Sequence, residues 1–373
     1  MAVRRFRPSR RVRYAVVGLG HISQAAVLPA FRNARRNSRL TALVSSDAEK
    51  LLTLGRRYRV RGLYSYEEYG DCLASGEVDA VYIALPNALH REHAERAARA
   101  GVHVLCEKPL AVTRAECQAM IDAARAGGVK LMTAYRLHFE AANLRAAEIV
   151  RSGRLGEPRL FESTFCMQVR PGNVRLEDEL GGGPLYDIGI YCINAARSLF
   201  AAEPLEVVAA TARGRDPRVA EVPEAASAVL RFPEERLASF SCSFGAADVG
   251  ALEVVGTKGR LRLDPAYEYA QGLALEVRVA GRTRRRRFPK RDQFAPELLH
   301  FSDCVLSDRD PEPSGLEGLI DVATIEAILA SARSGRAVAL DLPERHRRPE
   351  PRQQIRRPPV RKPRLVGVAS ASQ

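Results

Sequence analysis

The chain has 373 residues, 46% of them hydrophobic and 27% charged, which is enough for two domains of ordinary size with buried cores. No apolar run approaches the ~20 residues that cross a bilayer, which argues against a membrane-spanning protein. The net charge of +14 would suit a nucleic-acid-binding protein. However, six arginines lie in residues 1–13 and nine Lys or Arg in residues 341–373, so the part between these basic ends is nearly neutral. The sequence also contains no recognisable nucleic-acid module.

The N-terminal arm, residues 1–11, superficially resembles a twin-arginine export signal because it holds the pairs Arg4–Arg5 and Arg10–Arg11. No apolar segment follows these pairs before the first strand and a glycine loop, so we expect no cleaved signal. The seven cysteines are scattered without a C-x-x-C pair. Such cysteines suit free thiols in a reducing compartment better than a disulfide framework or a zinc site. We therefore expect a cytoplasmic protein.

In the first third of the chain, short apolar runs alternate with longer helical patterns. Strands are expected at Val12–Val17, Leu40–Val44, Ala80–Leu85, Val102–Cys106 and Val129–Ala134. Helices are expected at Ile22–Arg35, Ala48–Tyr58, Leu89–Ala100 and Thr113–Ala126. Thr113 and Glu116 are placed to form a capping box. This alternation predicts a parallel, doubly wound Rossmann sheet over residues 12–134, with ligands bound at the carboxyl ends of its strands.

The segment VVGLGHIS, residues 16–23, follows the first strand and opens the first helix. That context is what a dinucleotide-binding fingerprint requires. Gly18 would make the tight turn, and Gly20 would let the backbone approach a pyrophosphate at the helix N-terminus. The third glycine of the usual fingerprint is replaced by Ser23. An ordinary strand–turn–helix with glycine punctuation is the alternative.

The end of the second strand bears on the choice of cofactor. NAD sites usually place an acidic residue there for the ribose hydroxyls, but this strand is followed by Ser45 and Ser46. These hydroxyls and Lys50 could together hold a 2′-phosphate, which favours NADP over NAD. NAD stays an alternative, because Asp47 could accept a hydrogen bond from the ribose from a displaced position. Either Ser46 or Asp47 could also simply cap the next helix.

After about residue 150 the chain changes to strand-like runs joined by short polar turns. Strands are expected at Leu160–Val169, Leu205–Thr211, Ala225–Phe232, Leu237–Phe244, Ala251–Val255, Arg260–Leu263 and Leu273–Val279. Helices are expected at Gly183–Leu199, Gln293–Leu306 and Gly315–Ser334. This predicts a second α/β domain over residues 135–338 with a large, mostly antiparallel sheet. The helix 315–334 could pack back on the first domain, and the basic, Pro/Arg-rich residues 339–373 are expected to be a disordered tail.

Four further segments point to a family. They are ALPNALH at residues 84–90, LCEKPL at 105–110, AYRLH at 134–138 and GGGPLYDIGIYCINAAR at 181–197. With the glycine loop, they strongly resemble the glucose–fructose oxidoreductase/inositol dehydrogenase (Gfo/Idh/MocA) family, from about residue 12 to about residue 338. Any one segment is weak evidence, but five in this order are specific.

The resemblance implies a Rossmann domain followed by an α/β domain whose large sheet commonly serves as an oligomer surface, with the substrate between the domains. It places Lys108 at the active site and puts Asp187 and the residue four positions later on the reacting sugar hydroxyl. Most members have His at that later position, whereas this chain has Tyr191. That tyrosine and the segment LVSSDAEK, residues 43–50, resemble the glucose–fructose oxidoreductase branch and its NADP pocket.

The residues also make chemical sense by themselves. Oxidation of an alcohol requires a base for the hydroxyl proton as the hydride leaves, and Tyr191 could be that base. A neighbouring Lys108 ammonium would favour the phenolate. Asp187 lies four residues before Tyr191 and would share its helix face, with Asn194 close to that face. Asp187 could then orient a sugar hydroxyl by accepting its hydrogen bond.

We therefore expect Lys108, Tyr191 and Asp187 to be catalytic. The expected cofactor-binding residues are Gly18, Gly20, His21, Ile22, Ser45, Ser46, Lys50, Leu85, Pro86, Asn87, His90, Glu107, Lys108 and Arg136. The expected substrate-binding residues are Lys108, Tyr135, Arg136, Asp187 and Tyr191. The segment from Cys166 to Leu180 is expected to line the pocket, although its sequence has no interpretable pattern.

Each of these assignments has a structural alternative. Tyr191 could be a core tyrosine, and Lys108 could be a surface cation beside a turn. His90 and His93 have a spacing that suggests a metal site, but no recognisable metal motif accompanies them. We therefore expect these two histidines to lie on a helix surface and in a loop, and we expect no bound metal.

The sequence thus predicts an NADP-dependent oxidoreductase that transfers a hydride between a sugar, at the aldose C1 hydroxyl or on a related polyol, and nicotinamide. A variant of this function keeps NADP bound and reduces a second sugar in the same site. A non-catalytic dinucleotide sensor, or a protein that binds polyanions weakly through its basic ends, would also be compatible with the sequence. The expected partners are the sugar and further copies of the chain, in a dimer or tetramer formed through the second sheet, with no specific nucleic acid and no membrane. The sugar itself and the reaction direction stay undetermined.

Overall fold

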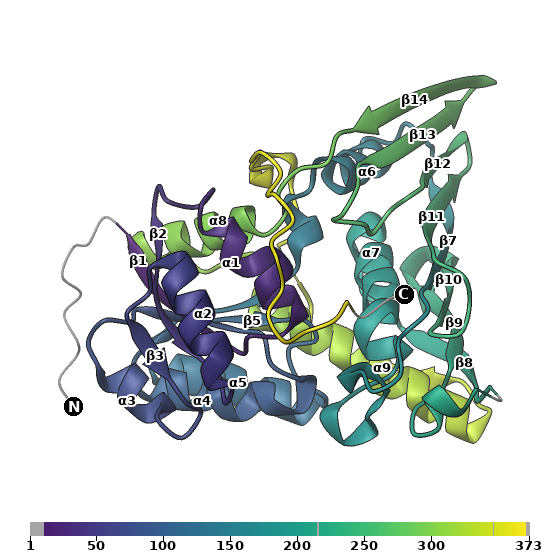
Figure 1. The fold of residues 1–373 in the computed structure, drawn as a ribbon. Helices are drawn as coiled ribbons and strands as arrows, with labels where there is room; N and C mark the ends of the chain where they lie inside the picture. Colours follow the sequence, from purple (N-terminus) through teal and green to yellow (C-terminus); the bar gives the residue numbers. More distant parts are fainter. Residues whose placement is uncertain (1–10, 215, 346, 371–373) are drawn as a thin grey trace.

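The computed structural model describes residues 11–214, 216–345 and 347–370, so nearly all of the expected N-terminal arm, residues 1–11, lies outside the described residues. Two β-sheets, each covered by helices, lie next to one another (Figure 1). None of the helices in the described part of the chain combines the length and apolarity that a membrane span needs. All seven cysteines are free and buried.

The first sheet is parallel and has the strand order β3-β2-β1-β4-β5-β6. Its strands are β1 (Val12–Val17), β2 (Ser38–Val44), β3 (Gly62–Tyr64), β4 (Ala80–Ile83), β5 (His103–Glu107) and β6 (Leu131–Ala134). Its helices are α1 (Leu28–Ala30), α2 (Ala48–Tyr58), α3 (Tyr69–Ala74), α4 (His90–Arg99), α5 (Arg114–Ala126) and α8 (Ala295–Leu306). This order is that of a Rossmann fold, which reverses direction between β1 and β4 and binds ligands there. The capping box of Thr113 and Glu116 is present at the start of α5.

The first helix differs from the expected Ile22–Arg35. The chain forms a π-helical turn at Ser23–Val27 and then only the short α1. Pro29, inside α1, has no N–H to donate, which limits continuation of a regular helix. The short β3 and α3 were not expected, because neither has enough residues to show a periodic apolar pattern.

The second sheet has the strand order β14-β13-β12-β11-β7-β10-β9-β8-β15. All its pairs are antiparallel except β7 with β10, which run parallel. Its strands are β7 (Pro158–Cys166), β8 (Glu206–Ala212), β9 (Ala225–Phe232), β10 (Arg236–Ser243), β11 (Val249–Gly256), β12 (Gly259–Leu263), β13 (Leu273–Val279), β14 (Arg282–Phe288) and β15 (Val338–Ala339). Its helices are α6 (Ala141–Arg151), α7 (Ile190–Phe200) and α9 (Gly315–Ser334), and a π-helical turn at Leu185–Gly189 leads into α7.

Strand β14 and helix α6 of this domain were not expected from the sequence, and neither was the two-residue strand β15. Strand β14 contains five arginines and exposes all of its residues except Phe288, so it has no apolar alternation to detect. Helix α6 is capped at its N-terminus by Glu140, whose carboxylate accepts hydrogen bonds from the N–H groups of Ala142 and Asn143. Its alanine-rich sequence gives only a weak apolar stripe.

Helix α9 connects the cores of the two domains. Leu319, Ile320 and Val322 in its first half pack with the core beside β4 and β5. Ile325 and Ile328 in its second half pack with the core of the second sheet. A helix that is apolar on all sides is buried on all sides, and α9 is in contact with both sheets.

The C-terminal segment after Ala339 differs from the disordered tail that its composition suggested. Its described residues, 340–345 and 347–370, follow a defined course, shown in yellow in Figure 1, that includes a short 3₁₀ turn at Pro351–Gln353. The physical reason is charge pairing: Arg345 forms an ion pair with Glu312, and Arg348 forms one with Glu203, both at 2.7 Å. Composition alone does not reveal that the folded part holds buried carboxylates for these arginines.

Candidate active site between the two domains

A cleft of about 1400 Å³ lies between the carboxyl edge of the first sheet and the second domain. It is lined by the glycine loop, the segments after β2, β4 and β5, the turn before α7, and parts of β7 and β11. Every residue expected to bind the cofactor lines it except His90, and every residue expected to bind the substrate lines it except Tyr135.

The glycine loop is shaped as a dinucleotide site requires. Gly18 has φ +93°, and a Cβ there would lie only 2.5 Å from the carbonyl oxygen of Ala84, so a side chain would collide with the segment after β4. A Cβ on Gly20 would meet no atom within 4 Å, which means that its backbone faces open space in the cleft. Ser23, in place of the third glycine, donates its hydroxyl to the carbonyl of Gly18 at 2.6 Å and holds the turn.

At the end of β2, Asp47 caps α2 by accepting a hydrogen bond from the backbone N–H of Lys50 at 2.9 Å. The Lys50 ammonium also lies 3.1 Å from the Asp47 carboxylate. The hydrogen bond from the Lys50 N–H and the Lys50 charge lower the pKa of Asp47. Ser45, Ser46 and Lys50 all line the cleft, so two hydroxyls and one ammonium border it just after β2.

In the cleft, Lys108 and Asp187 form a half-buried pair. Lys108 follows β5, and its ammonium donates to the Asp187 backbone carbonyl at 2.6 Å and to its carboxylate at 3.2 Å. Arg175 donates from Nε to the other carboxylate oxygen of Asp187 at 2.7 Å. Burial by itself would raise the pKa of Asp187, but the charges of Arg175 and Lys108 hold it at about 2. Asp187 is therefore ionised throughout the neutral range.

The ring of Tyr191 contacts two cations. The Lys108 ammonium is 4.7 Å from the ring centroid, and the guanidinium carbon of Arg136 is 5.0 Å from it. Arg136 is itself fixed because it donates to the backbone carbonyl of Tyr267 at 2.5 Å and to the side chain of Gln293. Such cation–π contacts place positive charge close to the phenol.

The local backbone before α7 differs from the regular helix that we expected. Asp187 lies in the π-helical turn Leu185–Gly189, and Tyr191 lies in the first turn of α7. Single π-helical turns occur frequently at functional sites. Asn194 does not join the cleft: its amide donates to Glu317 at 2.6 Å and to Asp321 at 2.8 Å, so it belongs to the packing of α7 against α9.

Two expected site residues lie behind the cleft instead of in it. His90 is fully buried, and its two ring nitrogens lie 2.9 Å from the carbonyl oxygens of Leu85 and Pro109. It thus holds together the two segments that do line the cleft. Tyr135 is buried with its ring stacked on that of His138 at 5.5 Å. Within the described part of the chain, no group of three or more His, Cys, Asp or Glu side chains could hold a metal ion.

Glu107 lies next to Lys108 and lines the cleft. The Tyr82 hydroxyl donates to its carboxylate at 2.7 Å. Burial raises the pKa of Glu107, and the hydrogen bond from Tyr82 and the charge of Lys108 only partly offset this. Glu107 therefore adds less negative charge to the cleft than Asp187 does.

Sequence reasoning missed several residues that line the cleft. Arg175 lies in the segment 166–180, which was expected to line the pocket but offered no pattern, and only the fold shows that its guanidinium meets Asp187. Tyr267 and Tyr269 follow β12, and no motif signals them. Val360, Lys362, Leu365 and Ser370 come from the C-terminal segment and also line the cleft. The sequence shows that this segment is basic, but it does not show that the segment folds back to the cleft.

Comparison with known proteins agrees with this geometry. Residues 12–135 match the model of an oxidoreductase family with an NAD-binding Rossmann fold, GFO_IDH_MocA, and residues 143–262 match the GFO/IDH/MocA C-terminal domain. The D-xylose 1-dehydrogenase [NADP(+)] of Haloarcula marismortui is 34% identical over 338 residues, which cover 88% of this chain and 93% of that protein.

Two solved structures share the fold over most of the chain. The aldose-aldose oxidoreductase from Caulobacter crescentus, complexed with glycerol, superposes with a TM-score of 0.85 at 41% identity and covers 89% of this chain and 100% of its own. A 3-ketoreductase from Actinomadura kijaniata in complex with NADP and TDP-benzene has a TM-score of 0.78 at 29% identity, with 86% of this chain and 98% of that chain covered.

Proposed function

Because the chain belongs to the Gfo/Idh/MocA oxidoreductase family, we propose that it is an NADP-dependent enzyme that transfers a hydride between the C1 hydroxyl of an aldose, or a related polyol, and nicotinamide. One observation carries the proposal: the phenol ring of Tyr191 contacts both the Lys108 ammonium and the Arg136 guanidinium in a cleft that includes the glycine loop. The NADP-dependent xylose dehydrogenase and the NADP-bound ketoreductase among its relatives support both the cofactor and the substrate class.

The chain's own residues fit NADP. The open space in front of Gly20 suits a pyrophosphate at a helix N-terminus. Ser45, Ser46 and Lys50 offer donors for the 2′-phosphate, and Asp47 is already engaged as a helix cap. When bound, NADP supplies the hydride acceptor or donor.

In this proposal Tyr191 exchanges the proton of the sugar hydroxyl. Lys108 and Arg136 both lie within 5.0 Å of the ring centroid of Tyr191, so two positive charges stand close to the group that would carry the proton. Asp187, kept ionised by Arg175 and Lys108, holds the ammonium of Lys108 in place. Its carboxylate oxygens have further lone pairs to accept a hydrogen bond from a sugar hydroxyl. Lys108 and Asp187 therefore position the reacting group, and Tyr191 moves the proton.

The test is an assay of the purified chain with a panel of aldoses and with NADP or NAD, followed by the Tyr191→Phe variant. We expect turnover with NADP, and a loss of about 10²–10⁴-fold in kcat for Tyr191→Phe, which is the usual contribution of a general acid–base. NADPH binding, measured by fluorescence, should be unchanged.

The matched control is Tyr186→Phe. Tyr186 lies five residues earlier, and its hydroxyl donates to the Val112 carbonyl at 3.0 Å, away from the cleft lining. This variant should keep its activity. Parental turnover in Tyr191→Phe would reject the catalytic assignment and revive the non-catalytic sensor.

A second candidate function is the transfer of hydride from one sugar to another while NADP stays bound. The observation in its favour is that residues of the C-terminal segment line the cleft. A purified protein that carries NADP through gel filtration and oxidises one aldose while reducing another, with no added cofactor, would support this function over simple dehydrogenation.

For the assembly, we propose a homo-oligomer formed through the outer face of the second sheet. That face exposes Val208, Val229, Leu160 and Leu237 on four neighbouring strands, each at least 41% exposed. Contiguous exposed apolar side chains are typical of interaction surfaces. Sedimentation of the parent and of a Val229→Glu variant tests this, and a monomeric parent would reject it.

A further inference from the structure

The C-terminal strap, defined here as residues 359–370, lies along the dinucleotide half of the cleft. Four of its residues, Val360, Lys362, Leu365 and Ser370, line the same cavity as the glycine loop. Figure 1 shows the segment in yellow, running past α1 between the two sheets. Although remote in sequence, the strap therefore borders the proposed cofactor site.

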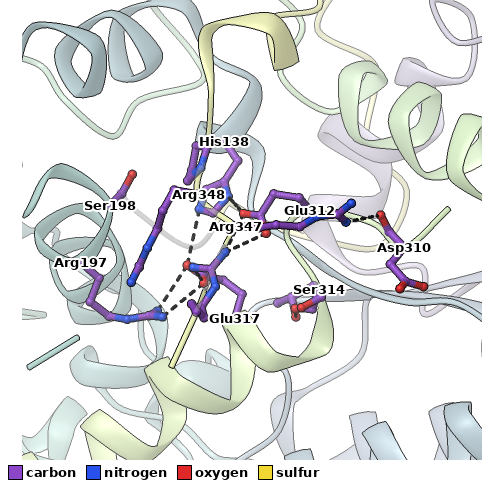
Figure 2. Close-up of polar contacts among 12 residues, drawn as sticks. His138, Arg197, Ser198, Asp310, Glu312, Ser314, Glu317, Arg347 and Arg348 are labelled. Atoms are coloured by element: carbon purple, nitrogen blue, oxygen red, sulfur yellow. Dashed lines mark hydrogen bonds and ion pairs between the residues drawn. The ribbon is translucent and has the colours of Figure 1, made fainter. Parts of the chain in front are cut away.

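The part of the chain before the strap is firmly anchored. Arg345 pairs with both Glu312 and Glu317, and Arg348 pairs with Glu203 at 2.7 Å. Figure 2 shows two of these carboxylates, Glu312 and Glu317, close to Arg197 and Arg348. The arginines neutralise acids that are otherwise buried, and removal of one partner of such a pair is costly. This anchor, residues 345 and 347–358, is thus tied to the second domain and α9 by ion pairs.

The strap itself is joined to the elements that flank the glycine loop. The backbone N–H of Val366 donates to the side-chain oxygen of Gln24 at 2.8 Å, and the Gln24 amide donates back to the Val366 carbonyl at 2.9 Å. Gln24 is fully buried in the π-helical turn after the glycine loop. Arg57, on α2, donates to the carbonyl of Arg364 at 2.6 Å. The strap therefore connects the first and second helices of the Rossmann domain.

The strap also brings charge and contact to the cofactor-binding residues. Lys362 lines the cleft together with His21, the residue after Gly20. Burial lowers the pKa of His21, and the positive charges of Arg175 and Lys362 add to this effect. Farther along, a Cβ on Gly367 would lie 3.1 Å from Lys50 Cε. The strap thus runs from the expected pyrophosphate position to the expected 2′-phosphate position.

The cleft keeps its volume of about 1400 Å³ with the strap in place, which exceeds the ~300–1000 Å³ typical of small-molecule sites. There is room for a dinucleotide under the strap. We propose that residues 359–370 form a cover over bound NADP, in which Lys362 binds the dinucleotide phosphates, and that this cover slows release of the cofactor. The proposal rests on the NADP-dependent function above, because it assigns a role to residues that border that same site.

A shortened chain that ends at Pro359 tests the cover. It removes Lys362 and the Val366–Gln24 pair but keeps the anchor, so the fold should survive, which circular dichroism and thermal unfolding would check. The measurement is the rate of NADPH release, followed by fluorescence in stopped flow with excess NADP as the trap. We expect release to be at least tenfold faster than from the full chain.

A point variant keeps the test independent of any loss of folding. Lys362→Ala should weaken NADPH binding at least threefold, with a larger effect at low than at high salt. The matched control is Arg361→Ala, which removes the neighbouring exposed charge that does not line the cleft and should leave NADPH binding unchanged.

The outcomes separate the two proposals. Equal release rates for the full and shortened chains, or equal effects of the two point variants, would overturn the cover while sugar turnover with NADP still stood. Tighter NADPH binding by the shortened chain would overturn it in favour of a segment that competes with the cofactor. Failure of the full chain to bind NADPH would overturn both the cover and the proposed function.

Discussion

At the scale of single residues, the centre of the cleft depends on how Asp187 is held. Its carboxylate is buried, yet the charges of Arg175 and Lys108 keep its pKa at about 2. A carboxyl pKa that is lower in the folded than in the unfolded state adds stability above the unfolded value of about 3.9 and loses it as pH falls through the folded value. Asp187 thus supports the folded site at every pH above the acid range.

We predict that Arg175→Gln raises the pKa of Asp187, because one of its two cationic partners is lost while its burial remains. The acid limb of the pH–rate profile should move to higher pH by about one unit or more, and kcat/KM at neutral pH should fall about tenfold to a hundredfold, the value of a hydrogen bond to a charged group. The pH dependence of turnover is the measurement. Arg159→Gln, which removes an exposed cation paired with Glu157 on the second domain, should leave the profile in place.

Glu297 gives a second prediction at this scale. Both of its carboxylate oxygens are buried, and among the residues that the structure describes neither has a hydrogen-bond partner. Burial raises the pKa of Glu297 well above the ordinary value. The folded chain therefore binds a proton that the unfolded chain releases above about pH 4.3, so stability declines as pH rises from there toward the folded pKa. Glu297→Gln should remove this decline and stabilise the protein by about 1–3 kcal/mol at neutral pH.

Urea unfolding of the parent and of Glu297→Gln at several pH values measures this effect. The stability difference should shrink as pH approaches 4. A Gln variant that is less stable than the parent at neutral pH would contradict the prediction and would indicate that the carboxylate has a partner in solution.

At the scale of elements, the two glycines of the glycine loop, Gly18 and Gly20, should differ in their effect on stability and on cofactor binding. Gly18→Ala should destabilise the fold by about 2 kcal/mol or more, because φ is +93° and the new Cβ would lie 2.5 Å from the Ala84 carbonyl oxygen. Gly20→Ala meets open space, so it should keep thermal stability while weakening NADPH binding. Thermal unfolding and NADPH titration of both variants provide the check, and equal loss of stability in the two would refute this account.

The elements also show what could be predicted from sequence and why. Strand β1 and helices α2 and α9 were predicted with their observed bounds, because each has a clear apolar pattern and a distinct start or stop. Strand β14 was missed because its arginines face solvent at a sheet edge. Charged side chains on an edge strand protect it from pairing with other chains. The arginines of β14 therefore suit an edge position, and they also replace the apolar alternation by which a strand is predicted from sequence.

For the site, motifs identified the residues that lie within recognisable sequence segments but not the residues from irregular segments that contact them. Lys108 and Asp187 were found because they lie in recognisable segments, and the structure brings them together. Arg175 was missed because its partner is twelve positions away across an irregular segment. His90 was assigned to the cofactor because it lies in a motif, although its ring nitrogens contact two backbone carbonyls.

At the scale of the whole molecule, the excess positive charge has a structural use. The C-terminal arginines do not simply add to a basic surface, because Arg345 and Arg348 meet buried acids that Arg197 also contacts. Arg197 is fully buried and binds Glu203, Glu317 and Asp321. The second domain, α9 and the C-terminal segment therefore share one ion network.

We predict that Arg197→Met destabilises the protein by about 3–5 kcal/mol, because it leaves carboxylates buried without their central cation. Chemical unfolding measures the loss. Arg333→Met, at the exposed end of α9, is the control and should change stability by less than about 0.5 kcal/mol. A small effect of Arg197→Met would mean that Arg345 and Arg348 suffice to neutralise the network.

Helix α9 has a mechanical consequence. Its first half packs in the core of one domain and its second half in the core of the other, so the two domains cannot swing apart unless the helix bends or breaks. Enzymes that open by a hinge bend at a few residues that join their lobes. In this chain any such opening would have to bend α9 near its middle, between the halves that pack in the two cores.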